Sequence, residues 1–347
     1  MRLEIESLWA RLRAPFVSAS GALTDRGVLL VRVEDADGHV GLGEASPLPD
    51  YHGVNVGDVR EALEAARAML AAADPGVSPR EALAEWSRLA VAPALAAVDI
   101  ALWDLDGRRA ARPVSRLLAA RPAEAVEVNA TIAAADRAGA AAQAAAIRAS
   151  GFRCVKVKVG LGDDAGRLAA VRAVLGPDVA IRLDANGAWS VSEATAALRA
   201  LAPVGIELCE EPVHGLAQAR QVAEAVPAVP IALDESASAA GALDEQVCQA
   251  VCLKIAACGG ITGLLDAARR ARAAGYEVYL ASTLDGPLGI AAALHAAAAL
   301  GPDRPCGLAT LGLFEGREDP LPARAGRIEV PTGPGLGDGL AAWYEAA

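Results

Sequence analysis

The sequence has few aromatic residues, few histidines and no excess of basic charge. Aromatic residues make up 3% of the 347 residues, and histidine occurs four times. Lys and Arg number 32 against 43 Asp and Glu, which gives a formal net charge of −11 at pH 7. A chain this acidic is a poor partner for nucleic acid or an anionic membrane, so we expect neither. A small anionic substrate would need a local cluster of positive charge.

Cysteine pairs with metal-binding or redox spacing are also absent. The six cysteines show no Cys-x-x-Cys spacing, and most lie in apolar runs, so we interpret them as reduced thiols in the core. Acidic residues occupy the N-terminal stretch MRLEIESLWARLR, where a signal peptide would need an apolar run. The longest apolar segment is interrupted by His295, which we interpret as a residue on a helix face. These features predict a cytoplasmic protein without a membrane span, and they are compatible with a homo-oligomer.

Short apolar runs alternate with alanine-rich segments from Val126 onward, which is typical of β-strand and α-helix units in a parallel sheet. We expect eight strands: VEVNATI from Val126, CVKVKV from Cys154, AIRLDAN from Ala180, IELCEEP from Ile206, IALDES from Ile231, AVCLKI from Ala250, EVYLAS from Glu277 and CGLAT from Cys306. This number favours a closed barrel over an open sheet. The predicted fold class is α/β: a β/α barrel at residues 121–311 with an α+β capping domain at 1–120. The segment 312–347 is expected to pack back on the capping domain.

Charged residues occur inside these strands, although alternate side chains of barrel strands point into a packed interior. The set comprises Lys156, Lys158, Asp184, Asn186, Glu210, Glu211, Asp234, Glu235 and Lys254. All lie near the carboxyl ends of their strands, where barrel enzymes assemble active sites. Converging carboxylates repel one another unless a cation holds them, and oxygen ligands select a hard ion such as magnesium. Buried salt bridges are the structural alternative, but they would remove several charges from water.

The adjacent acids Glu210-Glu211 and Asp234-Glu235 leave one choice open. Only one of two neighbouring strand residues can face the barrel interior, and spacing does not decide which one. The other member of each pair would support the site from behind or point outward.

The ordered motifs VKVKVG, RLDANGAWS, CEEPV, LDES and LKIAACGGI resemble the muconate-lactonizing branch of the enolase superfamily. The resemblance covers about residues 128–310 and is weaker upstream. It implies a modified TIM barrel in which Mg²⁺, or alternatively Mn²⁺, is held by Asp184, Glu210 and Asp234. It also implies that Lys158 and Lys254 lie on opposite faces of a small carboxylate substrate, with Lys156 assisting Lys158.

Such a site would remove a proton from the carbon next to a carboxylate. The enediolate that forms must be stabilised, and a divalent cation in a dry site supplies that stabilisation. A lysine that acts as the base must be neutral. We therefore expect the nearby cation and Lys156 to lower its pKa.

The stretch GLGEASPLPDYHG resembles the cap loop of o-succinylbenzoate synthases, and GLATLGLF is also similar to that family. The resemblance implies dehydration of a succinyl-hydroxycyclohexadiene-carboxylate, a lyase step of menaquinone biosynthesis. The implied substrate contacts are Arg182, Asn186, Ser282, Asp285, Gly307 and Tyr51. We expect the cap loop to affect substrate preference more than metal affinity.

A dipeptide epimerase or N-acylamino acid racemase is the main alternative. Asp285-Gly286 stands where synthases usually have Glu followed by Ser or Thr, which weakens that resemblance. Dipeptide epimerases usually carry Asp-x-Asp at strand eight, where this sequence has Ala309-Thr310-Leu311. Another cycloisomerase-like enzyme of the same branch, a Schiff-base aldolase using Lys254 and a binding scaffold are weaker alternatives.

Overall fold

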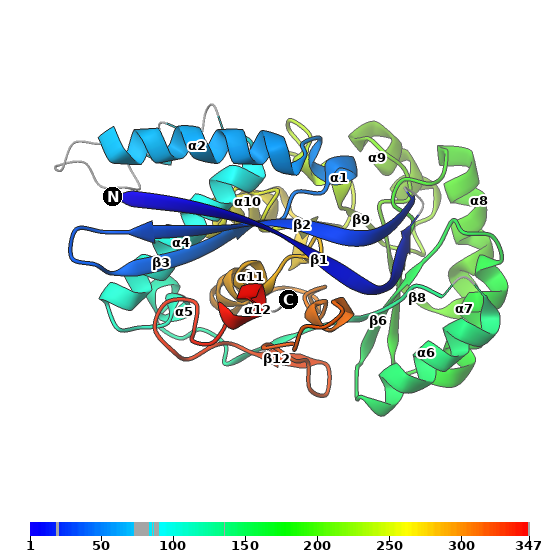
Figure 1. The fold of residues 1–347 in the computed structure, drawn as a ribbon. Helices are drawn as coiled ribbons and strands as arrows, with labels where there is room; N and C mark the ends of the chain where they lie inside the picture. Colours follow the sequence, from blue (N-terminus) through cyan, green and yellow to red (C-terminus); the bar gives the residue numbers. More distant parts are fainter. Residues whose placement is uncertain (19–20, 73–82, 85, 87–89, 135, 346–347) are drawn as a thin grey trace.

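The N-terminal part of the chain is a three-stranded antiparallel sheet covered by helices (Figure 1). The computed structural model describes residues 1–18, 21–72, 83–84, 86, 90–134 and 136–345. The sheet consists of β1 (Arg2–Ser18), β2 (Gly21–Glu34) and β3 (Val40–Ala45). The helices are α1 (Pro49–His52), α2 (Val56–Ala72), α4 (Ala92–Arg109) and α5 (Val114–Leu118).

The glycines of β3 allow α4 to pack directly on the sheet. A Cβ atom at Gly41 would collide with the carbonyl oxygen of Ala101, and one at Gly43 with that of Ala97. The motif VGLGEA therefore brings the helix close to the sheet, because only glycine leaves room for the helix backbone. This α+β domain agrees with the predicted fold class.

Seven parallel strands form the curved barrel sheet, in the order β5 to β11 along the chain. The strands are β5 (Ala130–Ile132), β6 (Cys154–Lys158), β7 (Ala180–Asp184), β8 (Ile206–Glu210), β9 (Ile231–Leu233), β10 (Ala250–Leu253) and β11 (Glu277–Leu280). The outer helices are α6 (Arg137–Ala149), α7 (Asp164–Leu175), α8 (Val191–Leu201), α9 (Leu216–Ala225), α10 (Ile261–Ala274) and α11 (Pro287–Leu300). Three short 3₁₀ helices are η1 (Ala202–Val204), η2 (Glu235–Ser238) and η3 (Leu311–Leu313).

The prediction of eight full strands was wrong at both ends of the sheet. The run from Val126 divides into β4 (Ala125–Glu127) and β5, because β4 pairs antiparallel with β12 (Arg327–Glu329) near the C-terminus. The run from Cys306 forms only isolated parallel bridges, Val128 with Cys306 and Ala281 with Gly307. These bridges occupy the eighth position of the ring.

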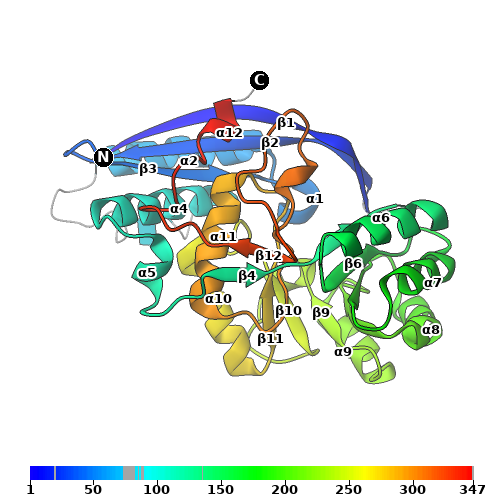
Figure 2. The ribbon, with the colours of Figure 1, turned by 90° about the horizontal axis from the view of Figure 1, so that it is seen from below.

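The C-terminal segment contacts both the barrel and the N-terminal sheet (Figure 2). It ends in α12 (Ala342–Glu345), whose Tyr344 hydroxyl donates to the Glu44 carboxylate of β3. His295 lies on α11, as expected of a helix-face residue, and it is fully buried. Its Nδ1 accepts from the Ser115 backbone N–H at 3.1 Å, and its Nε2 lies 3.2 Å from the Leu336 carbonyl. Burial lowers the His295 pKa to about 4, so the neutral ring links α11 to α5 and to the C-terminal segment.

The six cysteines are unpaired, and Cys258 alone is partly exposed. Within the described residues, no helix combines the length and the apolar character needed to cross a bilayer.

Candidate active site

Three lysines project into the barrel from two strands that lie across the ring from each other. Lys156 and Lys158 are two apart on β6, so they share a face, and valines alternate with them. Lys254 directly follows β10. Four strand positions separate β6 from β10 in the sheet order, and an eight-position ring places such strands opposite each other.

Each lysine contacts a carboxylate at the carboxyl end of a neighbouring strand. Lys158 Nζ lies 2.7 Å from Asp184 Oδ2, and Lys254 Nζ lies 2.7 Å from Asp234 Oδ2. Lys156 Nζ bridges two acids, at 2.7 Å from both Asp184 Oδ2 and Glu210 Oε1. The three acids are at most 1% exposed, so their charges act on one another through a medium of low dielectric constant.

The electrostatics of the three acids favour a bound cation. Burial raises the pKa of Glu210 to about 7 against the opposing charge of Lys156, and Asp234 and Asp184 raise it further. Burial acts in the same direction on Asp184, but Lys156 and Lys158 hold the Asp184 pKa well below its usual range. A group of carboxylates in which one member is driven towards protonation fits a site for a positive ion.

The donor atoms indicate which kind of cation fits. Ligand atoms of Glu210, Asp234 and Cys252 lie within 4.8 Å of one another, and Lys156 links Asp184 to Glu210. Burial raises the pKa of the Cys252 thiol well above its usual range, so this sulfur stays protonated and is a weak ligand. The carboxylate oxygens that remain suit a hard ion such as Mg²⁺.

Glu211 is buried beside the loop that carries Asp234, and Glu235 lines the cavity. Glu211 accepts from the backbone N–H groups of Asp234 at 2.8 Å and Ser236 at 3.0 Å, so it holds the loop that carries Asp234. Its backbone adopts φ 41°, an uncommon region for a residue other than glycine. Glu235 Oε1 accepts from Asn186 Nδ2 at 3.0 Å. The structure thus resolves the choice between adjacent acids, with Glu210 and Asp234 in contact with the lysines.

The turn after β7 has a local cause in the motif DANGAWSVSE. Asn186 and Gly187 have φ values of 45° and 70°, and both residue types tolerate the left-handed region. Ser190 and Glu193 then form a capping box that starts α8. This turn points the Asn186 side chain back towards Lys158, whose Nζ lies 2.7 Å from Asn186 Oδ1.

A cavity of about 290 Å³ opens above these residues and is closed by the N-terminal domain. Tyr51 of α1 is part of that closure, and its hydroxyl donates to Asp234 Oδ1 at 2.8 Å. Lys254 Nζ lies 4.0 Å from the centre of the Tyr51 ring. Phe16 of β1 lies on the other side, with its ring centre 5.5 Å from Lys158 Nζ. The capping domain therefore contacts both catalytic candidates.

Family models match two consecutive parts of the chain. Residues 139–341 match "Enolase C-terminal domain-like", and residues 4–119 match "Mandelate racemase / muconate lactonizing enzyme, N-terminal domain". The chain belongs to the enolase superfamily. It is an enzyme of that superfamily, and the predicted membership and fold class are confirmed.

Individual relatives include both of the predicted activity types. A D-Ala-D/L-Ala epimerase from Cytophaga hutchinsonii is 30% identical over 97% of this chain and 95% of the relative. An o-succinylbenzoate synthase from Mycobacterium tuberculosis is 42% identical, but over 55% of this chain and 59% of the relative. The L-Ala-D/L-Glu epimerase structure from Bacillus subtilis has a TM-score of 0.88 at 28% identity, covering 97% of this chain and 98% of that one. A Cytophaga hutchinsonii dipeptide epimerase, solved with Mg and D-Ala-L-Val, has a TM-score of 0.87 at 28% identity, covering 98% and 97%.

Four of the six residues predicted to contact substrate line the cavity, namely Asn186, Ser282, Gly307 and Tyr51. Arg182 and Asp285 do not line it. Arg182 is turned towards the opposite end of the barrel, where its Nε donates to Glu207 Oε2 at 2.7 Å. Asp285 is buried beside the start of α11 and accepts from the Thr283 hydroxyl at 2.9 Å.

Several cavity residues were not predicted from the sequence. They include Phe16, Leu23, Leu48, Asp50, Asn129, Thr131, His214 and Thr310. Asn129 and Thr131 could have been found, because they are polar residues two apart at the carboxyl end of an apolar run. The N-terminal residues carry no comparable signal, since nothing local indicates which part of a capping domain reaches the barrel.

The buried acids raise the pKa of two of the three lysines. Burial opposes the charged form of Lys254, but the charge of Asp234 outweighs it and raises the Lys254 pKa above its usual range. Asp184 and Glu210 do the same for Lys156. The three acids therefore keep these ammonium groups protonated until another cation neutralises the acids.

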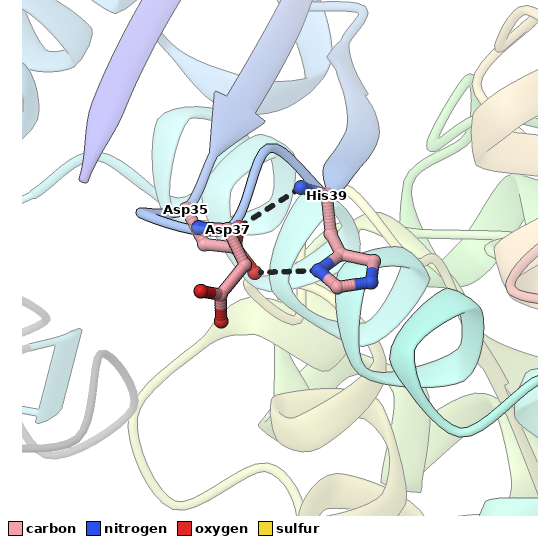
Figure 3. A group of neighbouring side chains, drawn as sticks. All are labelled: Asp35, Asp37 and His39. Carbon is pink, nitrogen blue, oxygen red and sulfur yellow. Dashed lines mark hydrogen bonds and ion pairs between the residues drawn. The ribbon is translucent and has the colours of Figure 1, made fainter.

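A second group of metal-binding residue types, Asp35, Asp37 and His39, lies at the turn between β2 and β3 (Figure 3). Asp35 Oδ1 accepts from the Asp37 backbone N–H at 2.8 Å and the His39 backbone N–H at 2.9 Å. Its other oxygen pairs with Arg109 at 2.7 Å. One oxygen thus closes the turn and the other links the turn to α4, so this group is structural.

Proposed function

We propose that the chain is a magnesium-dependent racemase or epimerase that inverts the carbon next to a carboxylate in an amino-acid derivative. The observation that carries this proposal is the placement of Lys158 and Lys254 on opposite sides of one small cavity. Inversion requires one group to remove the proton from one face and another to deliver a proton to the other face. Two lysines across a ring meet this requirement.

Asp184, Glu210 and Asp234 would hold the magnesium ion, with manganese as an alternative. The ion would supply positive charge to the substrate carboxylate, and this charge stabilises the enediolate oxygens. Support comes from the oxygen donor set and from the magnesium in the Cytophaga hutchinsonii dipeptide epimerase structure. Once the charge of Asp234 is neutralised, Lys254 can lose its proton more readily.

Each lysine has a separate part in the reaction. For one stereoisomer Lys158 removes the α-proton while Lys254 donates one to the opposite face, and the roles reverse for the other stereoisomer. Lys156, two residues before Lys158 in β6, contacts Asp184 and Glu210. It therefore stays protonated and balances the charge of these two acids. Phe16 and Tyr51 exclude water above the reacting carbon.

The substrate is proposed to be a small carboxylate whose α-nitrogen carries an acyl or peptidyl group. Epimerase relatives align with 97% of the chain, whereas the synthase similarity spans about half. Ala309, Thr310 and Leu311 provide no acid at the position where dipeptide epimerases usually hold an ammonium group. This difference favours N-acyl amino acids over free dipeptides.

The second candidate is o-succinylbenzoate synthase. The observation that favours it is the 42% identity of the aligned part. In this case only Lys158 would transfer a proton, and Lys254 would stabilise negative charge.

Proton exchange with deuterated solvent separates the two candidates. Purified protein with Mg²⁺ is incubated with each stereoisomer of N-succinylarginine and of D-Ala-Ala, and separately with the cyclohexadiene substrate. We expect one of the two amino-acid derivatives to be inverted, with deuterium at the α-carbon of both of its stereoisomers. Dehydration of the cyclohexadiene without inversion of either probe would favour the synthase, and activity that survives exhaustive chelation would contradict metal dependence.

A further inference from the structure

Glu235 and Asn186 form a bridge on the wall of the cavity next to Lys158. Asn186 Oδ1 lies 2.7 Å from Lys158 Nζ, and Asn186 Nδ2 donates to Glu235 Oε1 at 3.0 Å. Both bridging residues line the cavity.

The bridge leaves the Asn186 amide a single satisfactory orientation. A carboxylate only accepts hydrogen bonds, so Glu235 must face the NH₂ group of Asn186. The amide oxygen is then turned towards Lys158, whose nitrogen donates to it. Rotation of the amide by half a turn would place two acceptors together and two donors together, and both hydrogen bonds would be lost.

This orientation decides where the nitrogen of a neutral Lys158 directs its lone pair. The tetrahedral nitrogen bonds to Cε and has two N–H groups and one lone pair. Asp184 Oδ2 and Asn186 Oδ1 each lie 2.7 Å from Nζ, so together they take both N–H groups. The lone pair then takes the one remaining direction at the nitrogen, on the side of the cavity that Lys158 lines. A base needs its lone pair aimed at the proton that it removes.

Lys254 is held in a different way. Its Nζ contacts Asp234 Oδ2 at 2.7 Å and lies 4.0 Å from the Tyr51 ring centre. Neither contact passes through Asn186. A change in the bridge should therefore affect the two halves of a racemisation unequally.

Packing and hydrogen bonding alone do not explain why a glutamate occupies position 235. Its Oε2 atom is buried and has no hydrogen-bond partner among the described residues. A buried carboxylate oxygen without a donor destabilises the fold, so a residue kept for stability alone would not have this arrangement.

We propose that Glu235 is a positioning residue, which orients the Asn186 amide and through it the Lys158 nitrogen towards the substrate. The inference rests on the proposed racemase or epimerase function. It assigns Glu235 no contact with the substrate and no proton transfer.

The test compares solvent deuterium exchange from the two stereoisomers of N-succinylarginine in Glu235→Gln and in the wild type. Glutamine has nearly the same shape but can present either an oxygen or an NH₂ group to Asn186, so the amide loses its fixed orientation. We expect exchange from the isomer that Lys158 deprotonates to fall about tenfold in kcat, the order of one lost hydrogen bond, with KM unchanged. Exchange from the other isomer should change much less, and thermal stability should stay equal or rise.

Two further variants separate this role from others. Glu224→Gln, at an exposed position of α9, controls for the loss of one carboxylate. Asn186→Gly removes the bridge while keeping the left-handed backbone, because glycine adopts φ 45° without strain. Adding Glu235→Gln to Asn186→Gly should have no further effect on the ratio of the two exchange rates. The charge of Glu235 also acts on Lys254 directly, and such an effect would persist in that background.

The outcomes distinguish the inference from the function on which it rests. An equal fall for both isomers, or a full effect of Glu235→Gln in the Asn186→Gly background, would overturn the positioning role while leaving the racemase intact. Absence of exchange from both isomers of N-succinylarginine and of D-Ala-Ala in the wild type would overturn the proposed function itself.

Discussion

The two ends of the barrel both contain charged side chains, but they balance charge in different ways. At the amino-terminal end, Arg182 and Arg304 pair with Glu207 and Glu277 in equal number, through contacts of 2.5–2.7 Å. At the carboxyl end, the three lysines contact Asp184, Glu210 and Asp234, and two further acids, Glu211 and Glu235, lie beside them without an ion pair to a lysine. This end has two more carboxylates than lysines.

The difference shows which buried charges are structural. Arginines at the amino-terminal end remain charged at every accessible pH and bind carboxylates through several N–H groups. Lysines at the carboxyl end can lose a proton, and burial drives Glu210 and Glu211 towards protonation, so a bound cation would take the place of those protons. Buried salt bridges, the structural alternative considered for the strand charges, describe the first end but leave the second unbalanced.

The largest expected effect comes from removing an acid at the carboxyl end. Asp184→Asn, Glu210→Gln or Asp234→Asn should each abolish turnover and Mg²⁺ binding, because each removes a ligand charge. The melting temperature of the metal-free protein should not fall in Glu210→Gln, because burial already drives that carboxyl towards protonation, but it should fall in Asp184→Asn and Asp234→Asn, which leave buried lysines without a charged partner. Calorimetry with Mg²⁺ and thermal melts measure both, and turnover retained in all three variants would show that the acids are not ligands.

The lysines at the same end should give the next largest effects. Lys254→Arg should slow inversion by a factor of about 10²–10⁴, because arginine stays protonated and cannot act as a base. Exchange should survive from the isomer that Lys158 deprotonates, and nuclear magnetic resonance in D₂O detects it. Product formed at a substantial rate by Lys254→Arg from the cyclohexadiene substrate would instead support the synthase.

The sequence predicted the chemistry of the carboxyl end better than it predicted which residues line the cavity there. Charges at alternating strand positions identified the lysines and acids because a buried charge is costly without a purpose. Strand spacing shows that Arg182 faces inward, but it does not show to which end its long side chain bends. Asp285 follows strand β11, yet it turns away beside α11. Such directions depend on partners such as Glu207, which are distant in sequence.

The eighth strand position illustrates the same limit for the fold. Cys306 and Gly307 are hydrogen-bonded within the ring, but the chain then turns into η3. The apolar run from Cys306 is compatible with either outcome. The competition of β12 for β4 also involves a segment outside the barrel repeat, so local periodicity could not predict it.

At the amino-terminal end the expected effect is on stability and not on metal binding. Glu207→Gln would leave Arg182, which is fully buried, without its charged partner. Breaking a buried pair in this way costs about 3–5 kcal/mol of unfolding free energy. Urea denaturation measures the loss. Glu277→Gln is the matched control, because its side chain is 49% exposed and such pairs contribute about 0–1 kcal/mol.

The carboxyl end should also respond to pH, because the Glu210 pKa is raised to about 7 in the metal-free protein. A proton then competes with Mg²⁺, so affinity should increase about tenfold between pH 6 and pH 8. Calorimetry at the two pH values measures this change. An affinity independent of pH in this range would show that Glu210 is ionised throughout.

Stability should change with pH in the opposite sense when metal is absent. A carboxyl group whose pKa is higher in the folded than in the unfolded protein favours folding when protonated, and this contribution is lost as pH rises towards 7. Glu44 and Glu211, with pKa values raised by burial to about 7 and 8, act in the same direction. The metal-free protein should therefore be more stable at pH 5 than at pH 8, and saturating Mg²⁺ should reduce the difference.

The smallest expected effect concerns Tyr51, where the capping domain meets the carboxyl end. Its hydroxyl donates to Asp234 Oδ1 at 2.8 Å, so the loop contacts a proposed metal ligand as well as the cavity. Tyr51→Phe keeps the ring beside Lys254 but removes that hydrogen bond, worth about 0.5–1.5 kcal/mol. Mg²⁺ affinity should fall by a few-fold to about tenfold while KM changes little, and calorimetry with steady-state kinetics separates the two quantities.

Tyr51→Ala should also raise KM, because the ring that closes the cavity is lost. His52→Ala is the control, since its Nδ1 accepts from the Leu48 backbone N–H and not from the site. An unchanged Mg²⁺ affinity with a raised KM in Tyr51→Phe would show that the cap loop acts on the substrate alone, as the sequence had predicted.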